Sequence, residues 1–91
     1  MKDNQALIVV DVQKDFLETG ALPVKEGSQV VPVINRIIPK FKNVVFTQDW
    51  HPQGHISFAS SHPGIAPYST IDVSYGKQIL LPEHCVQNTS G

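Results

Sequence analysis

The chain has 91 residues, a formal net charge of −1 at pH 7, 41% hydrophobic residues and 16% charged residues. This length allows one domain at most, and the balanced charge gives no reason to expect a nucleic acid or an anionic membrane as a partner. Apolar runs stay well short of the ~18 residues that a membrane span requires, and the first residues lack the apolar core of a secretory signal. The single cysteine excludes an intramolecular disulfide, so we expect a cytoplasmic protein.

The first predicted element is a buried strand at residues 6–10, where Ala-Leu-Ile-Val-Val forms a continuous and largely β-branched run. Runs of this kind are typical of parallel strands that are covered on both faces. Asp11 follows at the carboxyl end of the strand. Residues 12–23 then indicate a loop, in which Gly20 permits a turn.

A helix is predicted next, beginning at Gly27-Ser28 with Ser28 as its N-cap. Pro39 should end or kink this helix near Ile38, because proline lacks the N–H that the helix needs. The apolar residues of the segment recur with the helical period and form one stripe: Val30, Ile34, Ile37, Ile38 and Phe41.

A second apolar strand at residues 44–47 completes a strand–helix–strand unit with a parallel sheet, which predicts the α/β class. One helix cannot cover both faces of two apolar strands, so we expect residues 1–91 to be the amino-terminal portion of a single, larger domain. Residues 52–91 are rich in Pro, Gly, Ser and His, and only residues 78–81 offer another short apolar stretch. This segment predicts a long loop excursion that builds a functional site.

Three side chains indicate a metal site. Asp49 and His51 come directly after the second strand, and residues two apart on extended chain point the same way. His84 is the third ligand candidate. One carboxylate and two imidazoles leave coordination positions open for water or substrate, which is typical of a catalytic metal site. The alternative is a polar strand end, with His51 hydrogen-bonded to a loop carbonyl.

Three further residues carry chemistry that the metal site does not use. Asp11 lies at a carboxyl strand end, where α/β folds place ligands, and it either acts as a general base or caps the next turn. His55 is expected beside the metal ligands, or linked to them through water, rather than as a ligand. Cys85 adjoins His84, but successive side chains of extended chain point in opposite directions. We therefore expect Cys85 to be a small buried core thiol rather than a nucleophile.

Five segments, residues 6–16, 20–24, 47–52, 55–60 and 81–88, are distributed in order along nearly the whole chain. In this order they resemble the amino-terminal half of a nicotinamidase (pyrazinamidase) of the isochorismatase-like cysteine hydrolase superfamily. The Asp-Trp-His-Pro and Pro-Glu-His-Cys-Val sequences are the specific ones, whereas Val-Asp-x-Gln-x-Asp-Phe is shared across the superfamily.

This resemblance implies a Rossmann-like three-layer α/β domain that hydrolyses nicotinamide to nicotinate and ammonia in NAD salvage, through a thioester on a cysteine. It implies that Asp11 is the base of a catalytic triad. Asp49, His51 and His84 would bind one divalent ion such as zinc, iron or manganese, and Phe16 would pack against the pyridine ring of the substrate. The implied partners are a small-molecule amide and the remainder of the same chain.

The chain departs from the family pattern in two ways. The family's triad lysine and nucleophilic cysteine lie well beyond the third metal-ligand histidine, and residues 86–91 contain neither a lysine nor a cysteine. The residue three positions before that histidine is often tryptophan in relatives, whereas here it is Leu81. We therefore expect residues 1–91 to be inactive alone. Another amidase of the superfamily and a non-catalytic metal-binding module stay open as alternatives, as does a homo-oligomer.

Overall fold

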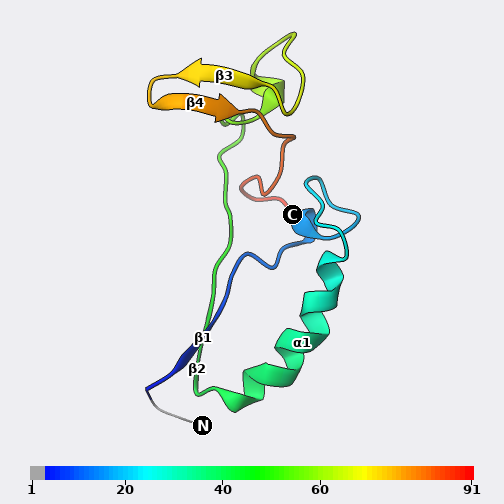
Figure 1. The fold of residues 1–91 in the computed structure, drawn as a ribbon, viewed down its shortest axis with the longest axis vertical. Helices are drawn as coiled ribbons and strands as arrows, with labels where there is room; N and C mark the ends of the chain where they lie inside the picture. Colours follow the sequence, from blue (N-terminus) through cyan, green and yellow to red (C-terminus); the bar gives the residue numbers. More distant parts are fainter. Residues whose placement is uncertain (1–3) are drawn as a thin grey trace.

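A two-stranded parallel sheet and one helix form the first half of the molecule. The computed structural model describes residues 4–91, and in it strand β1 (Ala6–Val9) pairs with strand β2 (Asn43–Phe46) from Ala6↔Asn43 to Val9↔Phe46. Helix α1 (Val30–Ile37) connects the two strands and lies alongside them (Figure 1). The predicted strand–helix–strand unit is therefore confirmed.

The start of the helix differs from the sequence prediction, because Ser28 is not the N-cap of α1. Ser28 lies in a 3₁₀ turn, η2 (Gly27–Gln29), and α1 begins two residues later, after Gln29. The N–H and the hydroxyl of Ser28 both donate to the carboxylate of Glu18, at 2.9 and 2.5 Å. These hydrogen bonds, with that from the hydroxyl foremost, lower the pKa of Glu18. A carboxylate from the preceding loop thus satisfies a donor at the start of the helical segment, which local sequence could not reveal.

The end of the helix agrees with the prediction from Pro39. Helix α1 stops at Ile37, and the chain continues as a 3₁₀ turn, η3 (Ile38–Lys40), that has Pro39 in its opening positions. The 3₁₀ turn ends at Lys40, and the chain is extended at Phe41 and enters β2 at Asn43.

The segment after residue 52 contains more regular structure than the sequence analysis predicts. Strands β3 (Thr70–Val73) and β4 (Gly76–Ile79) pair as an antiparallel hairpin, and a short 3₁₀ turn, η4 (Ala59–Ser61), precedes them. The missed signal is the alternation of polar and apolar residues in β3, followed by a two-residue connection and by Gly76, which begins β4 with a positive φ of 132°. Lys77 forms an ion pair with Asp72 across the hairpin, at 2.8 Å.

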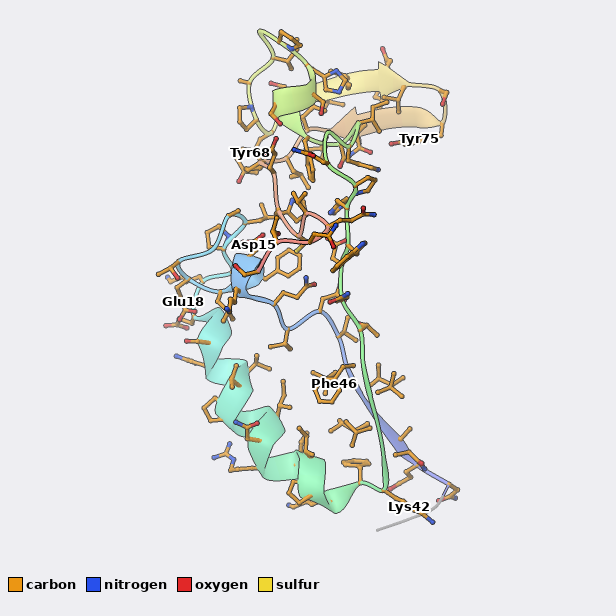
Figure 2. All side chains as sticks on the ribbon, turned by 180° about the vertical axis from the view of Figure 1, so that it is seen from behind. Asp15, Glu18, Lys42, Phe46, Tyr68 and Tyr75 are labelled. Carbon is orange, nitrogen blue, oxygen red and sulfur yellow. The ribbon has the colours of Figure 1, made fainter. Side chains whose placement is uncertain are left out.

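The molecule is elongated, and its buried core is unevenly placed. Its radius of gyration is 16.5 Å, against about 12 Å for a compact domain of this length, and the hairpin lies at the opposite end of the long axis from the sheet (Figure 1). Four of the five buried hydrophobic residues described lie beyond residue 57, and only Val9 is buried in the sheet. Phe46 is the last residue of β2, and its side chain lies on the side of α1 in Figure 2; the residue is 65% exposed. The sheet therefore needs further cover to form a core of its own.

Among residues 4–91, no helix has both the length and the apolar character needed to cross a membrane.

We predict that residues 1–91 on their own unfold without a cooperative thermal transition and bind a dye for exposed apolar surface, because Ile8, Val45 and Phe46 lack cover. Differential scanning calorimetry and ANS fluorescence measure the two properties, with a stable globular domain of similar length as the control. A cooperative transition in a monomeric preparation that binds no dye would show that two strands and one helix suffice.

Candidate metal centre

Asp49 and His51 lie on the extended chain that leaves β2. The side-chain amide of Gln13 holds this chain from the loop after β1: its oxygen accepts the Asp49 N–H at 2.7 Å, and its nitrogen donates to the Asp49 carbonyl at 3.0 Å. Asp49 and His51 point to the same side, and Nδ1 of His51 lies 3.5 Å from Oδ2 of Asp49. The period of two in extended chain accounts for this approach.

His84 reaches the same place from the carboxyl-terminal part of the chain. Backbone pairing between His51 and Val86 brings the two segments together: the His51 N–H donates to the Cys85 carbonyl, and the Gln87 N–H donates to the His51 carbonyl, both at 2.7 Å. As a result, Nε2 of the buried His84 lies 3.4 Å from Oδ2 of Asp49.

The three side chains fit a metal ion. Their candidate ligand atoms all lie within 4.8 Å of one another, and both nitrogen–oxygen separations match the ~3.3 Å expected between ligands about 2 Å from a tetrahedral ion. Nδ1 of His84 lies 2.9 Å from the Pro82 carbonyl, which can only accept, so Nδ1 is the ring nitrogen placed to donate and Nε2 is the one that faces the other candidate ligands. Nδ1 of His51 is buried without a hydrogen-bond partner. A cation would satisfy both nitrogen atoms.

Phe58 forms the apolar floor beneath the imidazole rings. Its side chain is fully buried, and its ring centroid lies 5.1 Å from that of His51 and 5.7 Å from that of His84. The tilted and edge-on arrangement of the rings is the one that aromatic side chains prefer. One of the most deeply buried side chains among residues 4–91 therefore supports the candidate ligands.

His55 lies next to this group but does not join it. Its ring centroid is 5.1 Å from that of His51, while its Nδ1 accepts the N–H of Ser57 at 3.1 Å and lies 2.7 Å from the Ser57 hydroxyl. The structure thus brings together Asp49, His51 and His84, with His55 at their border.

Asp11 lies two residues beyond the end of β1 and lines a neighbouring cavity. Its backbone has a positive φ of 51°, and its N–H donates to the carbonyl and hydroxyl oxygens of Thr47 at 3.2 and 3.1 Å. The Thr47 hydroxyl in turn donates to Oδ1 of Asp11 at 2.8 Å. Thr47 therefore orients the carboxylate, a function that the sequence analysis missed.

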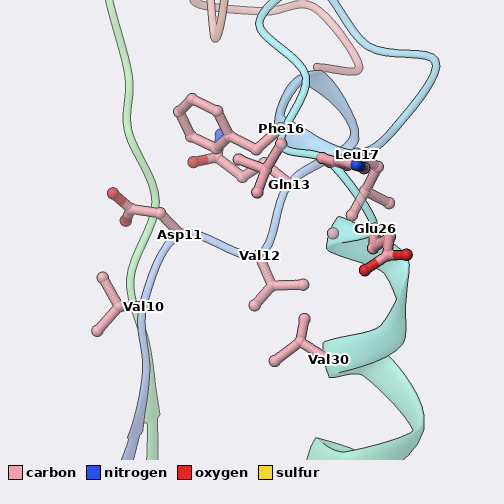
Figure 3. Close-up of a pocket in the computed structure, with 11 residues that line it drawn as sticks. Val10, Asp11, Val12, Gln13, Phe16, Leu17, Glu26 and Val30 are labelled. Atoms are coloured by element: carbon pink, nitrogen blue, oxygen red, sulfur yellow. The ribbon is translucent and has the colours of Figure 1, made fainter.

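The cavity beside Asp11 has a volume of about 320 Å³ (Figure 3). Phe16 is in its wall and also lies 5.7 Å, between ring centroids, from His84. Phe16 thus connects the cavity to the metal ligands, none of which lines the cavity itself. The lining is mostly apolar and comprises Val10, Asp11, Val12, Gln13, Phe16, Leu17, Val24, Lys25, Glu26, Gly27 and Val30.

Cys85 is a buried thiol, with 2% of its surface exposed. Burial, and next the negative charge of Asp49, raise the pKa of the Cys85 thiol to about 11. Since the thiolate is the nucleophilic form, this environment opposes nucleophilic chemistry at Cys85. Its burial agrees with the core thiol that the sequence analysis expects.

Comparison with known proteins gives a consistent result. Residues 5–89 match the isochorismatase domain. The chain is 53% identical over 87 residues to a nicotinamidase of Acinetobacter baylyi, which covers 96% of this chain and 41% of the relative. Among solved structures, an Acinetobacter baumannii nicotinamidase/pyrazinamidase matches with a TM-score of 0.90 and 50% identity, over 99% of this chain and 44% of that one.

A third match is a pyrazinamidase of Pyrococcus horikoshii whose structure contains zinc; it has a TM-score of 0.71 and 44% identity over 94% of this chain and 41% of that one. The present chain therefore spans less than half the length of the curated relatives and solved structures it matches. The match over residues 5–89 covers nearly all of it, and the likeness extends to the backbone fold. The chain belongs to the isochorismatase domain family.

Proposed function

We propose that this chain is the amino-terminal part of a metal-dependent amide hydrolase that converts nicotinamide to nicotinate and ammonia in NAD salvage, in the cytoplasm. The observation that carries the proposal is the approach of two imidazole nitrogens to a single oxygen of Asp49, at 3.5 and 3.4 Å. The likeness to nicotinamidases supports this choice of substrate among small amides.

Asp49, His51 and His84 would hold one divalent ion. Zinc, iron and manganese all accept a carboxylate with two imidazoles, and the zinc complex of the Pyrococcus horikoshii pyrazinamidase makes zinc the first choice. Such an ion would supply a Lewis acid at this place, to which the ring nitrogen of the pyridine substrate could bind. Phe16, which faces both His84 and the cavity, would pack against the ring.

Asp11 would act as the general base. Thr47 donates to one of its oxygens and leaves the other oxygen for proton transfer. In the proposed reaction Asp11 takes the proton of a cysteine thiol, the thiolate attacks the amide carbon, and the proton passes to the leaving ammonia. Water then hydrolyses the thioester and restores the thiol.

The nucleophile in this proposal lies outside residues 1–91. Cys85 is unsuited to the step because it is buried and its pKa is raised to about 11. Residues 1–91 would therefore supply the metal ligands, the base and part of the substrate wall, and would not turn over alone. A cysteine and a lysine elsewhere in the protein would complete the site.

We predict that His51→Ala in the complete protein abolishes binding of about one divalent ion per chain, because a tridentate site loses one of its three ligands. Elemental analysis after dialysis against zinc measures the ratio. His62→Ala is the matched control, since His62 is bound to the Ile56 carbonyl and lies outside the three-residue group. Unchanged metal content in the His51 variant would refute the ligand assignment.

We also predict that Asp11→Asn leaves the metal bound and lowers the rate of ammonia release from nicotinamide by roughly 10²–10⁴-fold, the usual contribution of a positioned acid–base group. A coupled ammonia assay measures turnover, and Asp72→Asn, a change in an exposed carboxylate of the hairpin, serves as control. Turnover retained in the Asp11 variant would remove this residue from the mechanism.

A further inference from the structure

The loop after β1 contains two polar residues to which the proposed mechanism gives no function. Gln13 and Asp15 belong to the Val-Asp-x-Gln-x-Asp-Phe sequence, two and four positions after Asp11. Both residues are only partly exposed, and each side chain hydrogen-bonds the backbone of a different metal-ligand segment. Neither contact is local, so both residues connect distant parts of the chain.

The side-chain amide of Gln13 hydrogen-bonds both the N–H and the carbonyl of Asp49. One amide group supplies an acceptor for the Asp49 N–H and a donor for the Asp49 carbonyl, in the way that a neighbouring strand would. No other side chain of similar length supplies both functions: glutamate lacks the donor, and methionine lacks a donor and a strong acceptor. The paired contacts fix the peptide units on both sides of the Asp49 Cα, and so the direction of its carboxylate.

Asp15 holds the peptide that joins His84 to Cys85. Its Oδ2 accepts the Cys85 N–H at 2.7 Å. Cys85 has a φ of 48°, in the left-handed region that is unfavourable for a residue other than glycine, asparagine or aspartate. A conformation of this kind persists when surrounding contacts impose it. The charged acceptor of Asp15 is such a contact, and it sets the direction from which His84 enters the site.

Together with the backbone pairing at the site, the two contacts form a closed series of hydrogen bonds. Gln13 holds Asp49, the backbone of His51 binds that of Cys85, and Cys85 is held by Asp15. This series of hydrogen bonds begins and ends in the loop after β1. The separation between the Asp49 carboxylate and the His84 imidazole is therefore set by one short loop of the chain.

We propose that Gln13 and Asp15 are positioning residues of the metal centre, which set its affinity by fixing the Asp49 and His84 segments relative to each other. This inference rests on the proposed metal site. It goes beyond it because neither residue supplies a ligand atom. Removing either contact leaves all three ligands in the chain but lets one segment shift, and supporting contacts of this kind change metal affinity by about 10–100-fold.

The test is a zinc titration of the complete protein against a chromophoric chelator, with Gln13→Met and Asp15→Ala as the disabling variants. Lys14→Ala is the matched control, because Lys14 lies between them on the same turn and is exposed. Two conservative variants keep the test decisive if a disabling variant folds poorly. Asp15→Asn keeps an acceptor for the Cys85 N–H, and Gln13→Glu keeps the acceptor for Asp49 while losing the donor.

We expect the zinc dissociation constant to rise about 10–100-fold in Gln13→Met and Asp15→Ala, less in Gln13→Glu, and within about threefold of wild type in Asp15→Asn and Lys14→Ala. We also expect the visible d–d bands of bound Co²⁺ to shift in the disabling variants alone, which a general loss of stability would not cause.

The outcomes separate this inference from the proposed function. If wild type binds zinc and His51→Ala does not, while Gln13→Met and Asp15→Ala match Lys14→Ala in affinity and Co²⁺ spectrum, the positioning inference is overturned and the metal site stands. If wild type binds no zinc, both fail.

Discussion

The arrangement of the whole site depends on one carboxylate oxygen that two imidazoles approach from different parts of the chain. Oδ2 of Asp49 lies 3.5 Å from Nδ1 of His51 and 3.4 Å from Nε2 of His84. The first contact follows from two positions on the same extended segment, whereas the second requires a segment from far along the chain. Holding these polar groups so close together, with His84 buried, is costly unless a partner satisfies them, and a divalent cation is the partner that fits all three.

This constraint accounts for where the most deeply buried side chains lie. Phe58 is fully buried under the His51 and His84 rings, and Leu80 and Cys85 are buried in the same half of the molecule. The parallel sheet, by contrast, leaves Phe46 65% exposed. The excursion after β2 is therefore the part with an organised interior, and the sheet is the part that requires further cover. A segment that builds a site needs such packing, because rigid surroundings hold the ligands in place.

Sequence patterns predicted the elements that local physics determines. The continuous apolar runs gave the two strands, Pro39 gave the end of the helix, and the period of two placed Asp49 beside His51. Ser28 was assigned as a helix cap because nothing in its neighbourhood reveals that Glu18 would bind it. The β3–β4 hairpin was missed because β4 is mostly polar and β3 lacks the continuous apolar run that marks β1 and β2.

The contacts that hold the site together could not be predicted from the sequence, for a different reason. Gln13, Asp15 and Thr47 act through hydrogen bonds to residues more than thirty positions away, and no periodicity records such pairs. Asp11 could be proposed from its place at a strand end, but its orientation by Thr47 required the register of β1 against β2. The long-range hydrogen bonds are thus the part of this site that could be identified only in the folded structure.

X-ray absorption at the zinc edge tests the central claim most directly, in the complete protein loaded with one equivalent of metal. Our account predicts a first shell of nitrogen and oxygen atoms only, with the outer-shell scattering of two imidazoles. Detection of a sulfur neighbour at about 2.3 Å, or of fewer than two imidazoles, would contradict it, because the ion would then be bound by Cys85 or by some other group.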